Sequence, residues 1–297
     1  MNYDVLVIGG GPAGLSAALQ LGRGCKKVLL CDAGPPRNAA AEEMHGFPTR
    51  DGTPPREFRR IGREQLAPYD VEVREVGVHH VEAQGRGFVV ALADGSTVRC
   101  RRVILATGMV DEIPDVPGIR EQWGRRIFQC PYCHGWELRG RPWGLLATSE
   151  QLLEFALFLT GWTEQVVAFT NGPLSIRDEL RQRLERAGVA LESRRIARLV
   201  AGPTDELAAV ELEDGTRRGC EALVVRPPQR QSAFVARLGL ALDDAGYVRI
   251  DEREETSVRG IYAAGDLTTP VQGALLAAAA GTRAAWAVNH ALNVHRD

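Results

Sequence analysis

The sequence predicts an α/β protein made of two related halves. Three observations lead to this fold class: a glycine-rich turn joins an apolar strand to a small-residue helix at the N-terminus, a second apolar strand then ends in an acidic residue, and a strand-hairpin pattern occurs twice along the chain. The length of 297 residues suits about two domains.

The N-terminal unit has the features of a dinucleotide-binding turn. The run "DVLVI" (Asp4 to Ile8) suits a buried parallel strand, and Gly9-x-Gly11-x-x-Gly14 opens the helix that follows. The first glycine permits a tight turn, the second lets a pyrophosphate approach backbone N–H groups, and the third lets helix and strand pack closely. The next strand, "VLLCD", ends in Asp32, which is placed to accept hydrogen bonds from a ribose.

Later segments extend the two halves. The segments "RRVILATG" (Arg101 to Gly108) and "GIYAAGD" (Gly260 to Asp266) are predicted strands that end in small polar turns, and an alanine-rich helix follows the second. Hairpins are predicted at the Asp94-Gly95 and Asp214-Gly215 turns. An amphipathic helix is expected over residues 174–189.

The order of these motifs resembles flavoproteins with two Rossmann-like dinucleotide-binding domains (the FAD/NAD(P)-binding fold), and the resemblance covers the whole chain. It implies FAD as cofactor. It places Asp266 on the ribityl chain and Gln272 and Gly273 at the pyrimidine edge of the flavin. The implied FAD-binding residues are Gly9, Gly11, Ala13, Gly14, Asp32, Asn38, His45, Thr107, Gly108, Gly265, Asp266, Gln272 and Gly273.

The stretch "FQCPYCHGWE" carries the second chemical signal. Cys130 and Cys133 are separated by two residues in a turn that enters a helix, which suits a redox disulfide and favours thiolate formation. Haem attachment would require export, and structural zinc would require a second cluster, which the isolated cysteines elsewhere and the pair His79-His80 do not supply. His134 is either a general acid/base or a structural histidine.

The surroundings of the cysteine pair resemble low-molecular-weight thioredoxin reductases, including the preceding "PG" (Pro117-Gly118) and "WG" (Trp123-Gly124). This resemblance implies that Cys133 faces flavin C4a and that Cys130 exchanges with substrate. His134 stands where those enzymes usually have an aspartate. The implied catalytic residues are therefore Cys130, Cys133 and His134.

The second nucleotide loop departs from the thioredoxin reductase pattern. In "GRPWGLLATSEQLLEFALFL", Ala147, Ser149 and Leu152 occupy the small-residue positions, and Glu150 brings a negative charge to the phosphate position. The segment "TNGP" (Thr170 to Pro173), where arginines for a 2′-phosphate are expected, contains no cation. We therefore expect that nicotinamide binding has been lost.

With this loop, "CPYCHG" and "TNGP" resemble the dithiol oxidases of the gliotoxin and holomycin type. The resemblance implies oxidation of a small-molecule dithiol to a disulfide with O2 as acceptor. The stretch "NAAAEEMHGFPTRDG" (Asn38 to Gly52) shares the likeness, and His45 within it is a flavin-contacting, proton-shuttling or merely structural residue. The main alternative is a reductase that passes electrons from NADPH or ferredoxin to a thioredoxin-like protein; a redox-silent binding module is disfavoured by the intact pair.

Domain layout and composition complete the prediction. The FAD domain is expected over residues 1–115 plus 245–297, with the disulfide-bearing domain inserted over 116–244. A net charge of -2, with 25% charged and 44% hydrophobic residues, argues against disorder and against nucleic acid as a partner. Without a leader or a long apolar stretch we expect a cytoplasmic protein with no membrane contact and no metal; a homodimer is expected because relatives form one.

Overall fold

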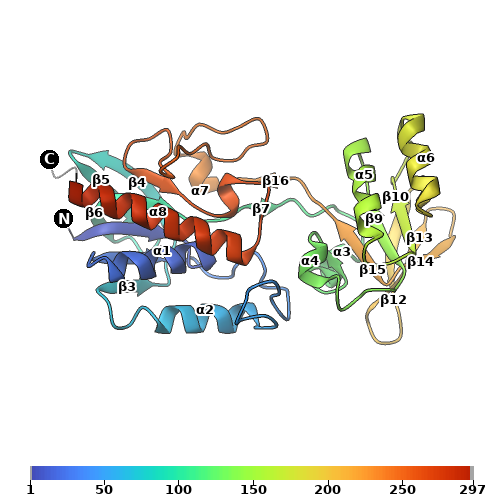
Figure 1. The fold of residues 1–297 in the computed structure, drawn as a ribbon, viewed down its shortest axis with the longest axis horizontal. Helices are drawn as coiled ribbons and strands as arrows, with labels where there is room; N and C mark the ends of the chain where they lie inside the picture. The colour runs from blue at the N-terminus through green and yellow to red at the C-terminus, as the bar shows by residue number, and fades with distance from the viewer. Residues whose placement is uncertain (1, 295–297) are drawn as a thin grey trace. The chain divides into compact units, whose positions relative to one another are not determined.

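The computed structural model describes residues 2–294 and divides the chain into two compact units (Figure 1). Unit 1 runs from the N-terminus to Ala39, from Gly46 to Asp111 and from Gln229 to the C-terminus. Unit 2 comprises Ala40–His45 and Glu112–Pro228. The sequence predicts an insert over 116–244, whereas the chain re-enters unit 1 at Gln229.

This early return has a structural cause. Strand β16 (Gln229–Arg230) pairs antiparallel with β7 (Val110–Asp111), so the outgoing and returning chains are hydrogen-bonded to each other at the edge of unit 1. The short helix α7 (Ala233–Ala236) then buries Val235 in the core of unit 1. Residues 229–244 therefore belong to the unit that contains the N-terminal strand.

Unit 1 is built on a mixed sheet with the order β3-β2-β1-β6-β5-β4. Strand β6 pairs in parallel with β1 on one side; on the other side it pairs antiparallel with β5 and, nearer its end, in parallel with β17. The strands are β1 (Tyr3–Ile8), β2 (Val28–Cys31), β3 (Val71–Arg74), β4 (Val78–Gln84), β5 (Gly87–Leu92), β6 (Thr97–Leu105) and β17 (Ile261–Ala263).

Three helices accompany this sheet: α1 (Pro12–Arg23), α2 (Pro55–Glu64) and α8 (Ala274–Val294), with the short turn η1 (Asp266–Thr268) before α8. Helices α1 and α8 run side by side (Figure 1). Their approach depends on Gly281, because a Cβ atom there would lie 2.0 Å from the carbonyl oxygen of Ala13. The apolar residues of β1 and β2 are buried, as the continuous apolar runs predict.

Unit 2 repeats the plan on a smaller scale. Its parallel sheet has the order β11-β10-β9-β15-β8, and a separate antiparallel sheet has the order β12-β13-β14. The strands are β8 (Ile127–Phe128), β9 (Trp143–Leu146), β10 (Val166–Phe169), β11 (Ala190–Glu192), β12 (Ile196–Ala201), β13 (Leu207–Leu212), β14 (Arg217–Gly219) and β15 (Ala222–Val225). The helices are α3 (Ile119–Gln122), α4 (Pro131–His134), α5 (Glu150–Leu159) and α6 (Asp178–Arg186).

Both predicted hairpin turns are present, at Asp94-Gly95 between β5 and β6 and at Asp214-Gly215 between β13 and β14. The helix expected over 174–189 is shorter, because the stretch that contains Leu174 and Ile176 packs onto the core of unit 2 before α6 begins at Asp178. In the part of the chain that the structure describes, no helix has the length and apolarity needed to cross a membrane.

Candidate functional site

The glycine turn of unit 1 has one open position and two closed ones. A Cβ atom at Gly9, where φ is 111°, would lie 2.3 Å from the carbonyl oxygen of Ala106, and one at Gly14 would lie 1.8 Å from the carbonyl oxygen of Gly9. At Gly11, nothing lies within 4 Å of such an atom. The turn therefore packs tightly against β6 on one side and leaves free space at the start of α1, as a pyrophosphate cradle requires.

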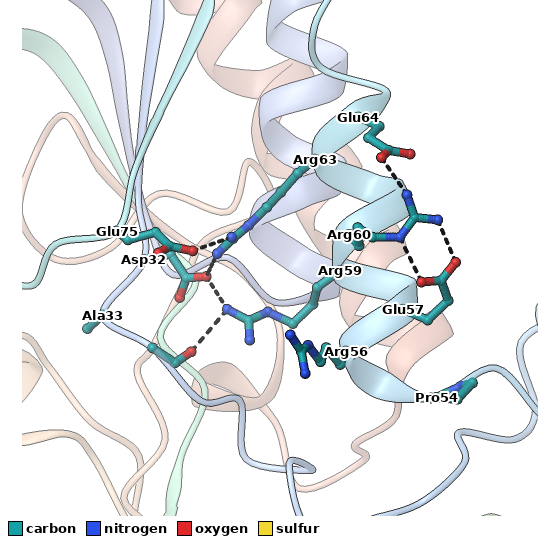
Figure 2. Close-up of a pocket in the computed structure, with 11 residues that line it drawn as sticks. Asp32, Ala33, Pro54, Arg56, Glu57, Arg59, Arg60, Arg63, Glu64 and Glu75 are labelled. Carbon is teal, nitrogen blue, oxygen red and sulfur yellow. Dashed lines mark hydrogen bonds and ion pairs between the residues drawn. The ribbon is translucent and has the colours of Figure 1, made fainter.

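Asp32, at the end of β2, is buried and held by arginines from α2. Its Oδ2 accepts hydrogen bonds from Arg59 and, at 2.7 Å, from Arg63. Arg59 also donates to the carbonyl oxygens of Gly10 at 3.3 Å and Gly34 at 3.0 Å. Figure 2 shows both side chains pointing from α2 toward Asp32, whereas Arg60 turns away from it. Asp32, Arg59 and Arg63 line a cavity of about 960 Å³.

Thr107 and Gly108 follow β6, whose end lies next to the end of β1. The Thr107 Oγ1 atom is buried and has no hydrogen-bond partner among the described residues. Gly108 has φ of 64°, and nothing lies within 4 Å of a Cβ atom built there. A buried hydroxyl without a partner is costly, so this atom is suited to a ligand that supplies the missing hydrogen bond.

Arg37 organises the C-terminal part of the predicted flavin site. It forms a bidentate pair with Asp111, with two distances of 2.6 Å, and also donates to Asp266 at 3.0 Å and to Gln272 at 2.6 Å. Burial raises the pKa of the Asp266 carboxyl, and the Arg37 guanidinium partly opposes that rise. Gln272 exchanges further hydrogen bonds with Gln229 on β16.

The redox pair lies at the start of the four-residue helix α4 in unit 2. Cys130 is the N-cap residue, and its Sγ is bonded to that of Cys133 with the two Cα atoms 5.4 Å apart. Gly135 ends this turn in a crowded position, where a Cβ atom would lie 2.7 Å from the ring of Trp143 and 2.8 Å from that of Trp162. Glycine at this position therefore lets the turn pack directly against the two tryptophan rings.

His134 is oriented by a single hydrogen bond and a ring stack. Its Nε2 lies 3.1 Å from the carbonyl oxygen of Gly124, and its ring stacks on Phe128 with centroids 5.2 Å apart. Because a carbonyl oxygen only accepts, Nε2 must carry the hydrogen. The buried Nδ1 is then the atom with a lone pair, and it has no hydrogen-bond partner among the described residues.

The charges around His134 act in opposite directions. Burial lowers the pKa of His134 and outweighs the Gly124 hydrogen bond and the Glu137 charge, which raise it. A positive charge on His45 would also lower the pKa of His134. The segment Ala40–His45 belongs to unit 2, together with the cysteine pair. The His45 Nε2 lies 3.6 Å from Glu43 and 3.8 Å from Glu137.

The loop before α5 is closed by its own side chains. Ser149 is the N-cap, and its Oγ accepts the Leu152 N–H at 3.3 Å. The Glu150 carboxylate accepts both the backbone N–H and the guanidinium N–H of Arg177, each at 2.9 Å. The segment "TNGP" itself contains no cation, as expected. Arg177, which lies just before α6, is the nearby cation, and it is paired with Glu150.

The remaining predicted residues all lie in unit 1. Asn38 is exposed in unit 1, Ala13 is buried in α1, and Gly265 (φ 91°) precedes η1, whereas Gly273 lies just before α8. The other cysteines are isolated: Cys25 is exposed, and Cys31, Cys100 and Cys220 are buried. No group of three potential metal ligands occurs within residues 2–294.

Five residues of these sites were not predicted from the sequence: Arg37, Arg59, Arg63, Glu137 and Arg177. The four-residue spacing of Arg59 and Arg63 places them on one helix face and could have drawn attention to them. Their partner Asp32 precedes them by a long stretch of chain, however, so only the fold identifies it. Glu137 ends the stretch "FQCPYCHGWE" and Arg177 lies in the helix expected over 174–189, but the sequence predicts no role for either side chain.

Comparison with known proteins identifies the family. A model of the pyridine nucleotide-disulphide oxidoreductase family matches residues 3–284. The chain belongs to this family. It is 36% identical over 305 residues to thioredoxin reductase sirT of Leptosphaeria maculans, covering 97% of this chain and 93% of the relative. It is also 36% identical over 275 residues to thioredoxin reductase tcpT of Claviceps purpurea, covering 89% and 86%.

Solved structures agree with this assignment. The crystal structure of HlmI superimposes with a TM-score of 0.94 at 36% identity, covering 99% of this chain and 94% of HlmI. An oxidoreductase from Agrobacterium tumefaciens gives 0.92 at 36% identity, covering 98% and 99%. This pyridine nucleotide-disulphide oxidoreductase is thus a thioredoxin reductase-like, FAD-dependent enzyme. The predicted fold class, family and cofactor are confirmed.

Proposed function

We propose that the protein is a dithiol oxidase, which converts a small-molecule dithiol to a disulfide and passes the electrons through FAD to O2. The observation that supports this most is the closed loop before α5. Dinucleotide binding at a helix N-terminus needs small residues and free N–H groups. Here the Ser149 Oγ accepts the Leu152 N–H, and the Glu150 carboxylate pairs with Arg177, a cation that could otherwise bind a phosphate. An oxidase needs no nicotinamide.

The residues of unit 1 fit the proposed FAD site. The open space at Gly11, the carboxylate of Asp32 and the unsatisfied hydroxyl of Thr107 would receive the pyrophosphate, a ribose and a further polar group. Asp266 and Gln272, both oriented by Arg37, would complete the site. When bound, FAD would accept two electrons from the reduced cysteine pair and pass them to O2, giving hydrogen peroxide.

In the proposed thiol chemistry the two cysteines take the electrons from the substrate. A substrate thiolate attacks the Cys130 Sγ, the bond to Cys133 breaks, and Cys133 leaves as a thiolate. The second substrate thiol attacks the mixed disulfide and releases the disulfide product and the Cys130 thiolate. The substrate thereby loses two electrons and two protons, and the cysteine pair gains the electrons.

His134 is proposed to handle these protons at a defined atom. Because Nε2 donates to Gly124, Nδ1 is the position that can accept a proton from an attacking thiol. The lowered pKa keeps the ring neutral near pH 7, so the lone pair is available. His45, whose Nε2 lies near Glu43 and Glu137, is proposed as a second proton carrier.

An anaerobic titration tests the proposal. NADPH, NADH and dithiothreitol are added separately to the yellow protein while flavin absorbance is followed. We expect dithiothreitol alone to bleach the flavin and air to restore it. Cys130→Ser should lose this response and turnover with FAD still bound, whereas Cys25→Ser, an exposed cysteine of unit 1, should behave as wild type. Retained turnover in Cys130→Ser would overturn the mechanism.

The second candidate is a reductase for a thioredoxin-like protein, and the names of sirT and tcpT favour it. Such an enzyme would accept electrons from NADPH or from ferredoxin. Rapid bleaching by NADPH in the same titration would make it the leading function and would mean that Glu150 and Arg177 move aside. A cytoplasmic location and a homodimer stay predictions.

A further inference from the structure

An aromatic cluster adjoins the redox turn in unit 2. The ring centroids of Tyr132 and Trp162 are 5.3 Å apart, those of Phe158 and Trp162 5.2 Å, and those of Tyr132 and Phe158 6.0 Å. All three pairs are edge-to-face contacts, the geometry that aromatic rings favour. We call Tyr132, Phe158 and Trp162 the aromatic platform.

The platform is anchored below and exposed above. Trp162 stacks on the fully buried Trp143, with centroids 6.3 Å apart. Tyr132, however, is 71% exposed and Phe158 43% exposed. Tyr132 lies between the two cysteines in the sequence, so the exposed rings are continuous with the reactive turn. Large apolar side chains gathered on a surface beside a reactive group indicate a binding surface.

We propose that the aromatic platform holds the apolar body of the substrate while its thiolate attacks Cys130, so that the substrate is a small, uncharged dithiol with a flat ring. This inference rests on the proposed dithiol oxidase function and names the substrate class and Tyr132 as a specificity-determining residue. Flat rings match the platform because they can pack edge-to-face or offset against Tyr132 and Phe158.

The size of the platform argues for a small occupant. If an aromatic side chain can bury ~200 Å², the exposed parts of Tyr132 and Phe158 offer on the order of 230 Å². A specific protein partner needs roughly 800 Å² on each side.

Charge argues in the same direction. The neighbouring cations, Arg139 and Arg226, lie over the rings of Trp136 at 3.9 Å and Phe155 at 4.8 Å. The three platform residues themselves carry no charge at neutral pH. An uncharged ring can therefore pack on the uncharged platform, whereas a charged dithiol would find no ion-pair partner among the three platform residues.

The test compares two dithiols that differ in the ring. Flavin reduction is measured with dithiothreitol and with ortho-benzenedimethanethiol for wild type, Tyr132→Ala, Tyr132→Phe, Phe158→Ala and the matched control Trp286→Ala, an exposed tryptophan of unit 1. We expect Tyr132→Ala and Phe158→Ala to raise the KM for the ring dithiol about 3- to 10-fold, with an unchanged KM for dithiothreitol. Tyr132→Phe and Trp286→Ala should resemble wild type.

A binding measurement separates this inference from the proposed function. The bis-methylthioether of the ring dithiol cannot exchange with a disulfide, and its binding is followed by tryptophan fluorescence. Binding that Tyr132→Ala weakens by about 3- to 10-fold supports the platform even if dithiothreitol fails to bleach the flavin, and that failure would contradict only the oxidase function. The platform would be overturned if the KM for the ring dithiol were the same in all variants, or if the thioether did not bind. An effect of Tyr132→Ala that is seen only with a protein disulfide as substrate would also overturn the platform.

Discussion

Replacing Arg59 should weaken FAD binding without unfolding the protein. Arg59 joins three segments of the proposed adenosine site, because it binds Asp32, the Gly10 carbonyl of the glycine turn and the Gly34 carbonyl after β2. The Asp32 side chain is only 8% exposed, so it depends on the two arginines for its charge compensation. In Arg59→Met, only Arg63 still binds the Asp32 carboxylate, and no side chain links Asp32 to the Gly10 carbonyl of the glycine turn.

The expected size follows from these contacts. A hydrogen bond that a charged carboxylate such as Asp32 makes is worth about 1.5–3 kcal/mol. Asp32 keeps one of its two arginines in Arg59→Met and is only partly misplaced, so we expect the bond to the ribose to weaken by about 1–2 kcal/mol, which corresponds to roughly a 5- to 30-fold rise in the Kd for FAD. Arg59→Lys should fall between wild type and Arg59→Met, because a single ammonium cannot reach all three acceptors.

The assay titrates the apoprotein with FAD and follows the quenching of flavin fluorescence. Arg60→Met is the matched control, since Arg60 lies on the same helix and lines the same cavity but pairs with the exposed residues Glu57 and Glu64 and turns away from Asp32 (Figure 2). Equal Kd values for the two variants would show that Arg59 does not build the site. A loss of folded apoprotein in Arg59→Met alone would also refute it, because the role would then be stability.

Other predictions concern protons, thiols and glycines. Flavin reduction by dithiols should slow as pH falls through the pKa of His134, which burial places below its ordinary 6.5, and His134→Asn should lack this limb. A histidine in the unfolded chain binds its proton at a higher pH than folded His134 does. The stability that neutral His134 contributes is therefore complete above about pH 6.5 and declines as the pH falls below that value, and a melting temperature that stays constant below pH 6.5 would contradict the burial. A thiol reagent should modify only Cys25 in the oxidised native protein and also Cys130 and Cys133 after reduction, since burial raises the pKa of Cys31, Cys100 and Cys220 to about 12; mass spectrometry of the labelled peptides decides. Gly14→Ala should strongly lower the melting temperature of the apoprotein, whereas Gly11→Ala should leave it unchanged and weaken FAD binding.

The parts of the fold that were predictable are those with local causes. The β1–α1–β2 unit follows from an apolar run, a glycine turn and a small-residue helix, and the Asp-Gly turns specify their hairpins within a few residues. The second domain boundary depends on β16, a strand of two residues that carries no periodic signal. Helix α6 starts late because tertiary packing overrides its local pattern.

The candidate site divides in the same way. Cys130, Cys133 and the glycine turn are local motifs, and their chemistry is visible in the sequence. The tautomer of His134 depends on the Gly124 carbonyl, and the state of Asp32 depends on side chains from α2. Such contacts join residues far apart in the chain, so no spacing rule reveals them. The location of His45 in unit 2 is a further example.

The pairing of β7 with β16 makes the disulfide-bearing unit a replaceable module. Val110 faces Arg230 and Asp111 faces Gln229, so the chain leaves and re-enters unit 1 at neighbouring positions, with Cα atoms about 5 Å apart. A turn of a few residues could close this gap and leave the path of unit 1 unaltered, apart from Ala40–His45, which would lose its neighbours. A unit 2 from another family member could be grafted at the same point onto unit 1, which carries the proposed flavin site.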